Sequence, residues 1–178
     1  MILRHTRLIP AILLLTALLC SCSASPAPSL SPEERTQLYR SAIERARDQE
    51  TNEALPVLSD PEDERADLLL SLLGVTPEDL ESFAVAVSPM NIKAYGIALI
   101  LPADGREDVV RDGLDSFVET QKNNFEFYLA DQYAIAEDAR VETLADGTCL
   151  LVLCEDADGV LDAIRSTLEE GGIPAGLS

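Results

Sequence analysis

"GIALILPADGREDVVRDGLDSFVE" (residues 96–119) and "GTCLLVLCEDADGVLDAIRSTLEE" (residues 147–170) follow the same plan. Each stretch begins with a run of apolar residues, which predicts a strand. Each then passes through an acidic turn with an Asp-Gly pair and continues with apolar residues at helical spacing. The repeat predicts two strand-to-helix units within one domain.

A further strand precedes each unit. In "SFAVAVS" (82–88) larger apolar residues alternate with alanine, and "IKAYGIALIL" (92–101) predicts a second, longer strand. Gly96 within it indicates a bulge or the close approach of another element. "ARVETL" (139–144) and "TCLLVLC" (148–154) predict a hairpin. The order is therefore strand, strand, helix, and then the same again.

Two amphipathic helices need an apolar surface to cover, and one face of an antiparallel sheet supplies it. We therefore predict an α+β fold, with an antiparallel sheet of about four strands and helices on one face. N-terminal helices are expected to cover the apolar surface that these two helices leave exposed. The two strand–strand–helix units are expected to superpose roughly.

Two N-terminal segments carry helix signals. Ser31 precedes Pro32, which suits the first position of a helix, and the two glutamates that follow suit its positive end. A second helix is predicted over residues 60–74, with Asp60 as a cap and Gly74 at its end. The acidic run at its start fits a helix start with a solvated face better than a functional patch.

The first residues resemble the export signal of bacterial lipoproteins. Arg4 and Arg7 precede an apolar run over residues 8–19, about twelve residues long. A helix of that length spans roughly 18 Å, which is too short for the ~30 Å hydrocarbon core of a bilayer. The run therefore predicts a signal peptide, not a permanent span.

"LCSC" (residues 19–22) resembles a lipobox, in which a cysteine receives a diacylglyceryl group and becomes the first residue of the mature chain. Cys22 follows the small Ser21, whereas Cys20 follows the bulky Leu19, so Cys22 is the predicted lipid attachment site. An ordinary signal peptide with incidental cysteines is the alternative. Two acyl chains would anchor the protein durably to the extracytoplasmic face of the bacterial cell membrane.

The predicted organisation has five parts. Residues rich in Ser, Pro and Ala follow Cys22 and have the composition of a semi-extended tether. The parts are a signal peptide (1–21), a tether (22–34), a helical segment (35–74), an α+β domain (75–170) and a C-terminal tail (171–178).

The charge of the chain excludes one class of partner. The formal net charge is −19, and it becomes −21 after removal of Arg4 and Arg7 with the signal peptide, because all 32 acidic residues lie beyond Cys22. Such a charge repels phosphate backbones, so nucleic-acid binding is not expected. A cation or a basic envelope protein remains a possible partner, although acidic surfaces often serve solubility alone.

No catalytic or cofactor motif is present in the sequence. The only histidine, His5, lies in the predicted signal peptide, so neither a histidine-based nucleophile pair nor a Cys-x-Cys metal clip is expected in the mature chain. Lys93 and Lys122 leave a Ser–Lys pair open, but neither lies in a recognisable motif. No catalytic residue, metal or cofactor is therefore assigned.

"EDADG" (155–159) resembles part of a calcium-binding loop. However, Cys154 and Arg165 would fall at the first and last ligand positions, and neither supplies the carboxylate that such a loop needs there. A strand-to-helix turn with a capping acid explains it better.

"NNFEFYLADQY" (123–133) gathers aromatic side chains that could line a ligand or partner groove, or could close the core where a helix ends. They are Phe125, Phe127, Tyr128 and Tyr133.

Cys149 and Cys154 are predicted to be buried thiols, not a disulfide. They lie five positions apart in one predicted strand, so they point to opposite faces and are separated by roughly 16 Å. A disulfide needs Cα atoms within ~7 Å.

Over residues 75 to about 168 the chain resembles an uncharacterised family of bacterial lipoproteins, the domain of unknown function DUF4358. The resemblance rests on the order and spacing of "GVTPEDLESFAVAVSPMN", "YGIALI", "ETQKNNFEFY" and "LLVLCEDADGVLDAI". In the family a proline often follows a tyrosine after the first long helix. Here Leu129 follows Tyr128, so that loop is expected to differ. The resemblance implies a small α+β domain on a lipid anchor and no activity.

Two classes of function are compatible with these features. The first is a membrane-anchored binding or interaction module without chemistry, and the second is an envelope enzyme or enzyme accessory that uses carboxylates the sequence does not single out. Converging acids with raised pKa values in a cleft would favour the second class. A solvated acidic surface would favour the first, which we expect.

Overall fold

The computed structural model describes residues 30–177, so the signal peptide, Cys22 and most of the tether lie outside the described residues. The α+β class, the four-stranded antiparallel sheet and the N-terminal helices are confirmed. None of the described helices is long and apolar enough to cross a membrane. The elements are α1 (Pro32–Arg45), α2 (Gln49–Ala54), α3 (Ala66–Leu72), a 3-10 turn η1 (Pro77–Asp79), β1 (Leu80–Val87), β2 (Gly96–Pro102), α4 (Glu107–Phe125), α5 (Ala130–Glu137), β3 (Arg140–Thr143), β4 (Cys149–Leu153) and α6 (Ala157–Glu170).

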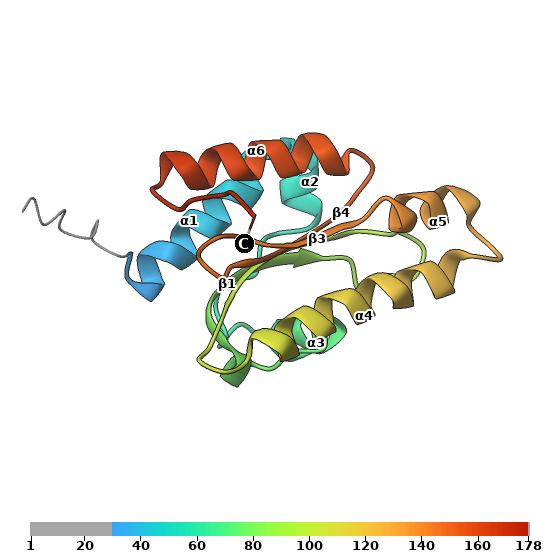
Figure 1. Cartoon of the computed structure of the whole chain (residues 1–178). Coiled ribbons are helices and arrows are strands. Elements are labelled where there is room, and N and C mark those ends of the chain that lie inside the picture. Colours follow the sequence, from blue (N-terminus) through green and yellow to red (C-terminus); the bar gives the residue numbers. More distant parts are fainter. Residues whose placement is uncertain (1–29, 178) are drawn as a thin grey trace, which may run out of the picture.

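The sheet has the strand order β1-β2-β4-β3, and all neighbours are antiparallel (Figure 1). The two predicted hairpins therefore lie side by side and meet at the β2–β4 pair, where Ala98 is opposite Leu151. The strand–strand–helix order occurs twice, as predicted, with α5 added after the first unit.

Helices cover both faces of the sheet, so the prediction of helices on one face is wrong. α3, α4 and α5 pack with one set of strand residues, which includes Val85, Ala98 and Leu151. α1 and α6 pack on the opposite face with the alternate set, which includes Leu99 and Leu150. Figure 1 shows the sheet between these two helix layers.

The composition of the central strands explains this arrangement. β2 and β4 are apolar at nearly every position, and all residues of β4 are buried. A strand that faces water on one side alternates between polar and apolar residues, whereas a strand buried on both sides does not. Both faces of this sheet therefore need a helical cover.

The two units do not superpose as wholes. In the strand order β1-β2-β4-β3, β1 corresponds to β3 and β2 corresponds to β4, and corresponding strands run in opposite directions. A rotation that places one hairpin on the other therefore has its axis perpendicular to the sheet. Such a rotation keeps each face on its own side. Since α4 and α6 lie on opposite faces, only the hairpins correspond.

Further segments pair near both edges of the sheet. Leu58 forms two backbone hydrogen bonds of 2.8 Å with Val85 of β1. Beside β3, the C-terminal segment pairs with the start of the β3–β4 turn, where the Ala145 N–H donates to the Gly176 carbonyl at 2.8 Å. β3 is only four residues long, so little free edge remains.

The second predicted helix is shorter than expected. Residues 60–74 contain only the seven-residue α3, because local contacts hold the preceding residues in turns. The carboxylate of Asp60 accepts the backbone N–H of Glu62, and that of Asp63 accepts the N–H of Arg65. Such side-chain bonds compete with helix formation. Gly74 ends the segment at φ +70°, as a helix-terminating glycine does.

Glycine lets α4 come close to two neighbouring elements, β2 and α3. A Cβ on Gly96 would lie 2.7 Å from Cε1 of Phe117, so this glycine admits α4 close to β2, as its position in the strand predicted. A Cβ on Gly113 of α4 would collide with the carbonyl oxygen of Leu73 at the end of α3. Glycine at these positions sets the distance between α4 and its neighbours.

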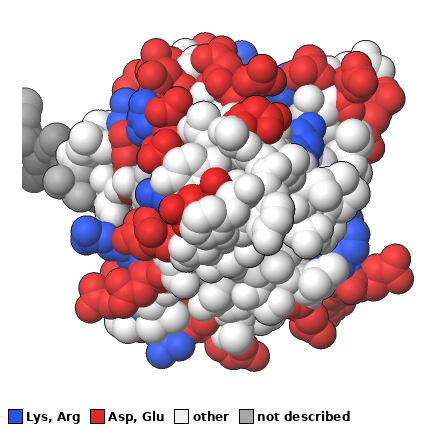
Figure 2. All heavy atoms as spheres, turned by 90° about the vertical axis from the view of Figure 1, so that its right-hand side faces the viewer, with Lys and Arg blue, Asp and Glu red and all other residues white. Residues whose placement is uncertain are grey.

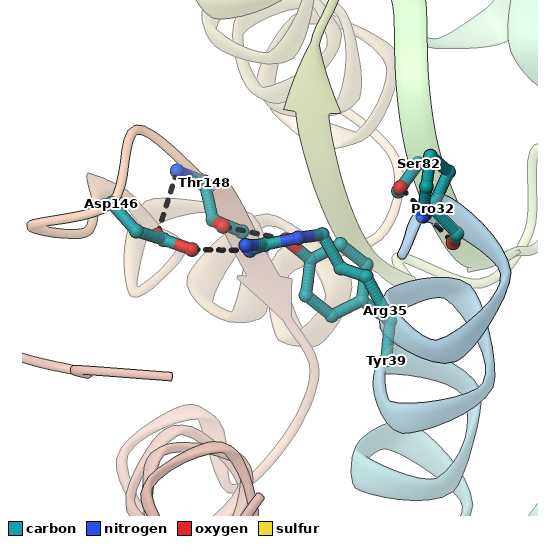
Figure 3. Close-up of polar contacts among 6 residues, drawn as sticks. All are labelled: Pro32, Arg35, Tyr39, Ser82, Asp146 and Thr148. Carbon is teal, nitrogen blue, oxygen red and sulfur yellow. Dashed lines mark hydrogen bonds and ion pairs between the residues drawn. The ribbon is translucent and has the colours of Figure 1, made fainter. Parts of the chain in front are cut away.

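A polar network fixes α1 against the β3–β4 turn (Figure 3). Arg35 forms an ion pair with Asp146, and the hydroxyl of the fully buried Tyr39 lies 2.6 Å from that of Thr148. Asp146 also accepts the backbone N–H of Thr148. On the other side, Ser82 of β1 donates to the carbonyl of Pro32. These contacts hold the helix across one face of the sheet.

Candidate functional site

One end of the molecule gathers the features that distinguish its surface. In Figure 1 this is the right-hand end, where α4 turns into α5, whereas the described chain begins at the opposite end. The β1–β2 loop (88–95) reaches the same end, since the Ala94 N–H donates to the Gln132 side chain of α5 at 2.8 Å. β4 also finishes here and leads into α6.

A cleft of about 420 Å³ opens between these segments. Its volume falls within the range of small-molecule sites. The wall combines small apolar side chains with charged and neutral polar groups. It is formed by Ala46, Arg47, Asp48, Thr51, Lys93, Ala94, Tyr95, Gln132, Ile135, Cys154, Glu155, Asp156 and Val160.

The cleft contains two cations that no carboxylate neutralises. Eleven of the basic residues lie in the described part of the chain, and eight of them form an ion pair with Asp or Glu. Within residues 30–177, the three basic residues without such a partner are Arg47, Lys93 and Arg111, and the first two line this cleft. The same wall also carries three carboxylates, those of Asp48, Glu155 and Asp156, but none of them forms an ion pair with either cation.

Neutral groups hold the two cations in place. Arg47 donates to the carbonyl of Leu55 at 3.1 Å, to the hydroxyl of Tyr95 at 3.3 Å and to the side chain of Asn52. The ammonium group of Lys93 lies 5.6 Å from the centre of the Tyr95 ring. Tyr95 therefore contacts both cations, and its position at the start of β2 links them to the sheet.

Two of the acids around the cleft are already engaged. Asp48 caps α2 and accepts the Thr51 N–H at 2.7 Å, which is the main reason that its pKa is lowered. Asp156 caps α6 and accepts the Gly159 N–H at 3.2 Å. The latter contact confirms the strand-to-helix turn with a capping acid predicted for residues 155–159.

The other titratable groups of the cleft are poor nucleophiles. Burial raises the pKa of the Tyr95 hydroxyl and of the Cys154 thiol, so both stay protonated at neutral pH. Lys93 has no hydrogen bond to a serine among the described residues, and Lys122 pairs with Glu119 at 2.8 Å. Neither the Tyr95 hydroxyl nor the Cys154 thiol is therefore activated as a nucleophile.

Exposed apolar side chains lie on the segments around the cleft. Phe127 and Tyr128, in the α4–α5 turn, are 78% and 87% exposed, and Met90 and Ile92 are exposed in the β1–β2 loop. Figure 2 views this end directly and shows a broad uncharged surface bordered mostly by Asp and Glu, with Lys and Arg among them. We call the four residues Met90, Ile92, Phe127 and Tyr128 the apolar rim.

The structure separates the four aromatic residues singled out in the sequence. Phe125 is fully buried in the core beneath α4, and Tyr133 is partly buried against the same core. Only Phe127 and Tyr128 are exposed, and neither is a wall residue of the cleft described above. The exposed pair, the β1–β2 loop residues and the two unpaired cations belong to one end of the molecule.

The model of the family described as "Domain of unknown function (DUF4358)" matches residues 58–154, which is more than half of the chain. The chain therefore belongs to this family, and the resemblance to this domain of unknown function is confirmed. The match includes all four strands, α4 and α5, while α1 and α6 lie outside it. No curated protein and no solved structure matches the chain.

Proposed function

We propose that this protein is an extracytoplasmic lipoprotein, held to the membrane by lipid on Cys22, whose domain binds a partner protein in the cell envelope and performs no chemistry. The short apolar run and the residues before Cys22 support the anchor. The uncharged end with its apolar rim supports the binding role, because four large apolar side chains gathered on two exposed loops mark an interaction surface.

The position of this end supports an encounter with a partner. The described chain begins at the opposite end of the domain (Figure 1), so an anchor before residue 30 leaves the apolar rim free to face away from the attachment point. The segment rich in Ser and Pro after Cys22 has the composition of a tether, which would raise the domain above the lipid surface.

The charges define the chemistry of the partner. Acidic residues predominate around the uncharged surface (Figure 2), so we propose a protein with an apolar centre and a margin of Lys and Arg. Complementary margins of this kind steer association and exclude acidic competitors.

The carboxylates of the domain support binding over catalysis. Every Asp and Glu with a shifted pKa among the described residues is shifted downward, mostly by hydrogen bonds to its ionised form. A general acid at neutral pH needs the opposite shift.

Metabolic labelling with a fatty-acid analogue tests the anchor. The wild type is expected to carry the label and to lose it in Cys22→Ala, while Cys20→Ala keeps it. Loss of the label in Cys20→Ala alone would assign the lipid to the other cysteine.

Cross-linking in intact cells tests the binding surface. A single cross-linked species is expected with the wild type and is expected to disappear when Phe127 and Tyr128 are both changed to serine. The matched control is Leu68→Ser, because Leu68 is also an exposed apolar residue but lies on α3, outside the rim. A species that persists in the double variant, or disappears equally in the control, would refute the proposed surface.

A further inference from the structure

We propose that the cleft lined by Arg47, Lys93 and Tyr95 binds a small organic anion, through a carboxylate or phosphate group placed between the two cations. This inference stands on the cleft and its charges and is independent of the apolar rim and of the anchor.

The pairing of charges is the first observation. Acidic residues outnumber basic ones by almost three to one in the described chain, and eight of its eleven cations have a carboxylate within 4.0 Å. Arg47 and Lys93 are exceptions on the same cleft wall. Two positive groups that share a concave site and have no carboxylate within 4.0 Å can each accept an oxyanion as a partner.

The fixed geometry of Arg47 is the second observation. Three neutral acceptors on α2, on the segment after it and on Tyr95 hold the guanidinium in one orientation. Its Nε is buried and has no acceptor among the described residues. A guanidinium that is positioned before binding loses little freedom when an oxyanion arrives, so more of the interaction energy remains for binding.

The strongly negative net charge of the chain does not prevent an anion from binding in the cleft. Exposed charges farther apart than ~8 Å are largely screened at physiological ionic strength, so the two cations and three carboxylates of the wall matter more than the net charge of the chain. Asp48 and Asp156 lie nearby, but each shares its charge with a backbone N–H at the start of a helix. Glu155 is the remaining wall carboxylate, and it is exposed.

The rest of the wall defines the body of the ligand. Ala46, Ala94, Ile135 and Val160 are apolar, and Thr51 and Gln132 are neutral. The volume of about 420 Å³ corresponds to roughly fourteen waters at ~30 Å³ each. The ligand class is therefore a compact molecule with one anionic group and an uncharged, partly apolar body.

NMR titration of the isotopically labelled protein tests the site with the simplest members of this class. The probes are acetate and inorganic phosphate at constant ionic strength, with acetamide as the uncharged counterpart of acetate. We expect saturable shifts of the backbone amide signals of Lys93, Ala94 and Tyr95 with at least one anion, and none with acetamide. Response to acetate identifies a carboxylate site, and response to phosphate alone identifies a phosphate site.

Two variants within the cleft and one control variant outside it assign the binding. Lys93→Gln is expected to weaken the anion about two- to fivefold, as for an exposed ion pair. Lys122→Gln removes the same charge from α4, outside the cleft, and is expected to leave the affinity unchanged. Arg47→Gln is expected to weaken binding about tenfold or more, with thermal unfolding measured in parallel.

Equal shifts with acetamide, shifts scattered over the surface, or equal affinities in Lys93→Gln and Lys122→Gln would each overturn the proposal. The last comparison holds even if Arg47→Gln fails to fold.

Discussion

At the scale of single residues, the two thiols show how burial controls reactivity. Cys149 and Cys154 are free and buried, as predicted, and they belong to the cores on opposite faces of the sheet. Burial is the main reason that the pKa of each thiol is raised, so the unreactive protonated form dominates at neutral pH.

We expect both thiols to resist iodoacetamide in the native protein at pH 8 and to react fully after denaturation. Intact-mass analysis checks both states, and Cys149→Ser shows which thiol any partial reaction involves. A native mass two protons lower than that of the reduced protein would reveal a disulfide instead.

Asp79 is the residue whose contacts most clearly make the stability of the fold depend on pH. Its buried carboxylate accepts the Thr76 N–H at 2.8 Å and the Thr76 hydroxyl at 3.0 Å, and it pairs with Arg106. The backbone N–H of Thr76 is the main cause of its lowered pKa, against the opposing effect of burial. The ionised form therefore stabilises the folded state above the unfolded pKa of about 4, and this stabilisation is lost as the pH falls through the folded pKa.

Asp79→Asn is expected to lower the free energy of unfolding by about 1–3 kcal/mol at pH 7, because it weakens two hydrogen bonds and the ion pair. The difference from the wild type should shrink below pH 4. Urea unfolding at pH 7 and pH 3 measures both values, with the exposed Asp104→Asn as a control. A difference that stays constant over this range would contradict a role for the charge.

At the scale of elements, the contact between α4 and α3 depends on one missing side chain. A methyl group on Gly113 would meet the backbone carbonyl of Leu73, which cannot rotate away. α4 or α3 would have to shift within a packed core, where such overpacking costs about 1–3 kcal/mol.

Gly113→Ala is therefore expected to destabilise the domain, although alanine has the higher helix propensity. Gly176→Ala serves as the control, since nothing lies within 4 Å of a Cβ at that position. Thermal unfolding of both variants checks the prediction. Gly113→Ala with a melting temperature at or above that of the wild type would show that the helices yield more easily than expected.

The sequence predicts the elements with strong periodicity and misses those without it. All four strands, α1, α4 and α6 follow from apolar patterns and caps. α2 (Gln49–Ala54) has no buried residue, and α5 buries only Ala136, so neither has an apolar stripe to detect. The cover on both faces could have been expected from "CLLVL" (149–153), which lacks the alternation of a half-exposed strand.

The candidate site was only partly predictable for a different reason. Helical spacing places Phe125 on the buried stripe of α4, but Phe127 and Tyr128 lie beyond the end of that helix, where the spacing no longer predicts exposure. Arg47 and Lys93 lie 46 positions apart, and their lack of acidic partners depends on where every carboxylate of the folded chain lies. Such a property belongs to the tertiary structure.

At the scale of the whole molecule, charge distribution governs any encounter. The uncharged end has an acidic margin (Figure 2), so the affinity for a basic partner is expected to fall as salt rises. Pull-down from envelope extract at 50 mM and 500 mM NaCl, quantified for the partner found by cross-linking, measures this. Equal capture at both concentrations would show that the apolar rim alone provides the affinity.

The contacts at the two edges of the sheet affect how the protein behaves when many copies lie close together. A row of unpaired backbone groups invites another chain to add a strand, which leads to domain exchange or fibrils. Here Leu58 occupies the border of β1, and the C-terminal segment lies beside the short β3. The proposed lipid anchor would crowd copies of the protein together in two dimensions, and these contacts would leave neighbouring copies less free backbone to join.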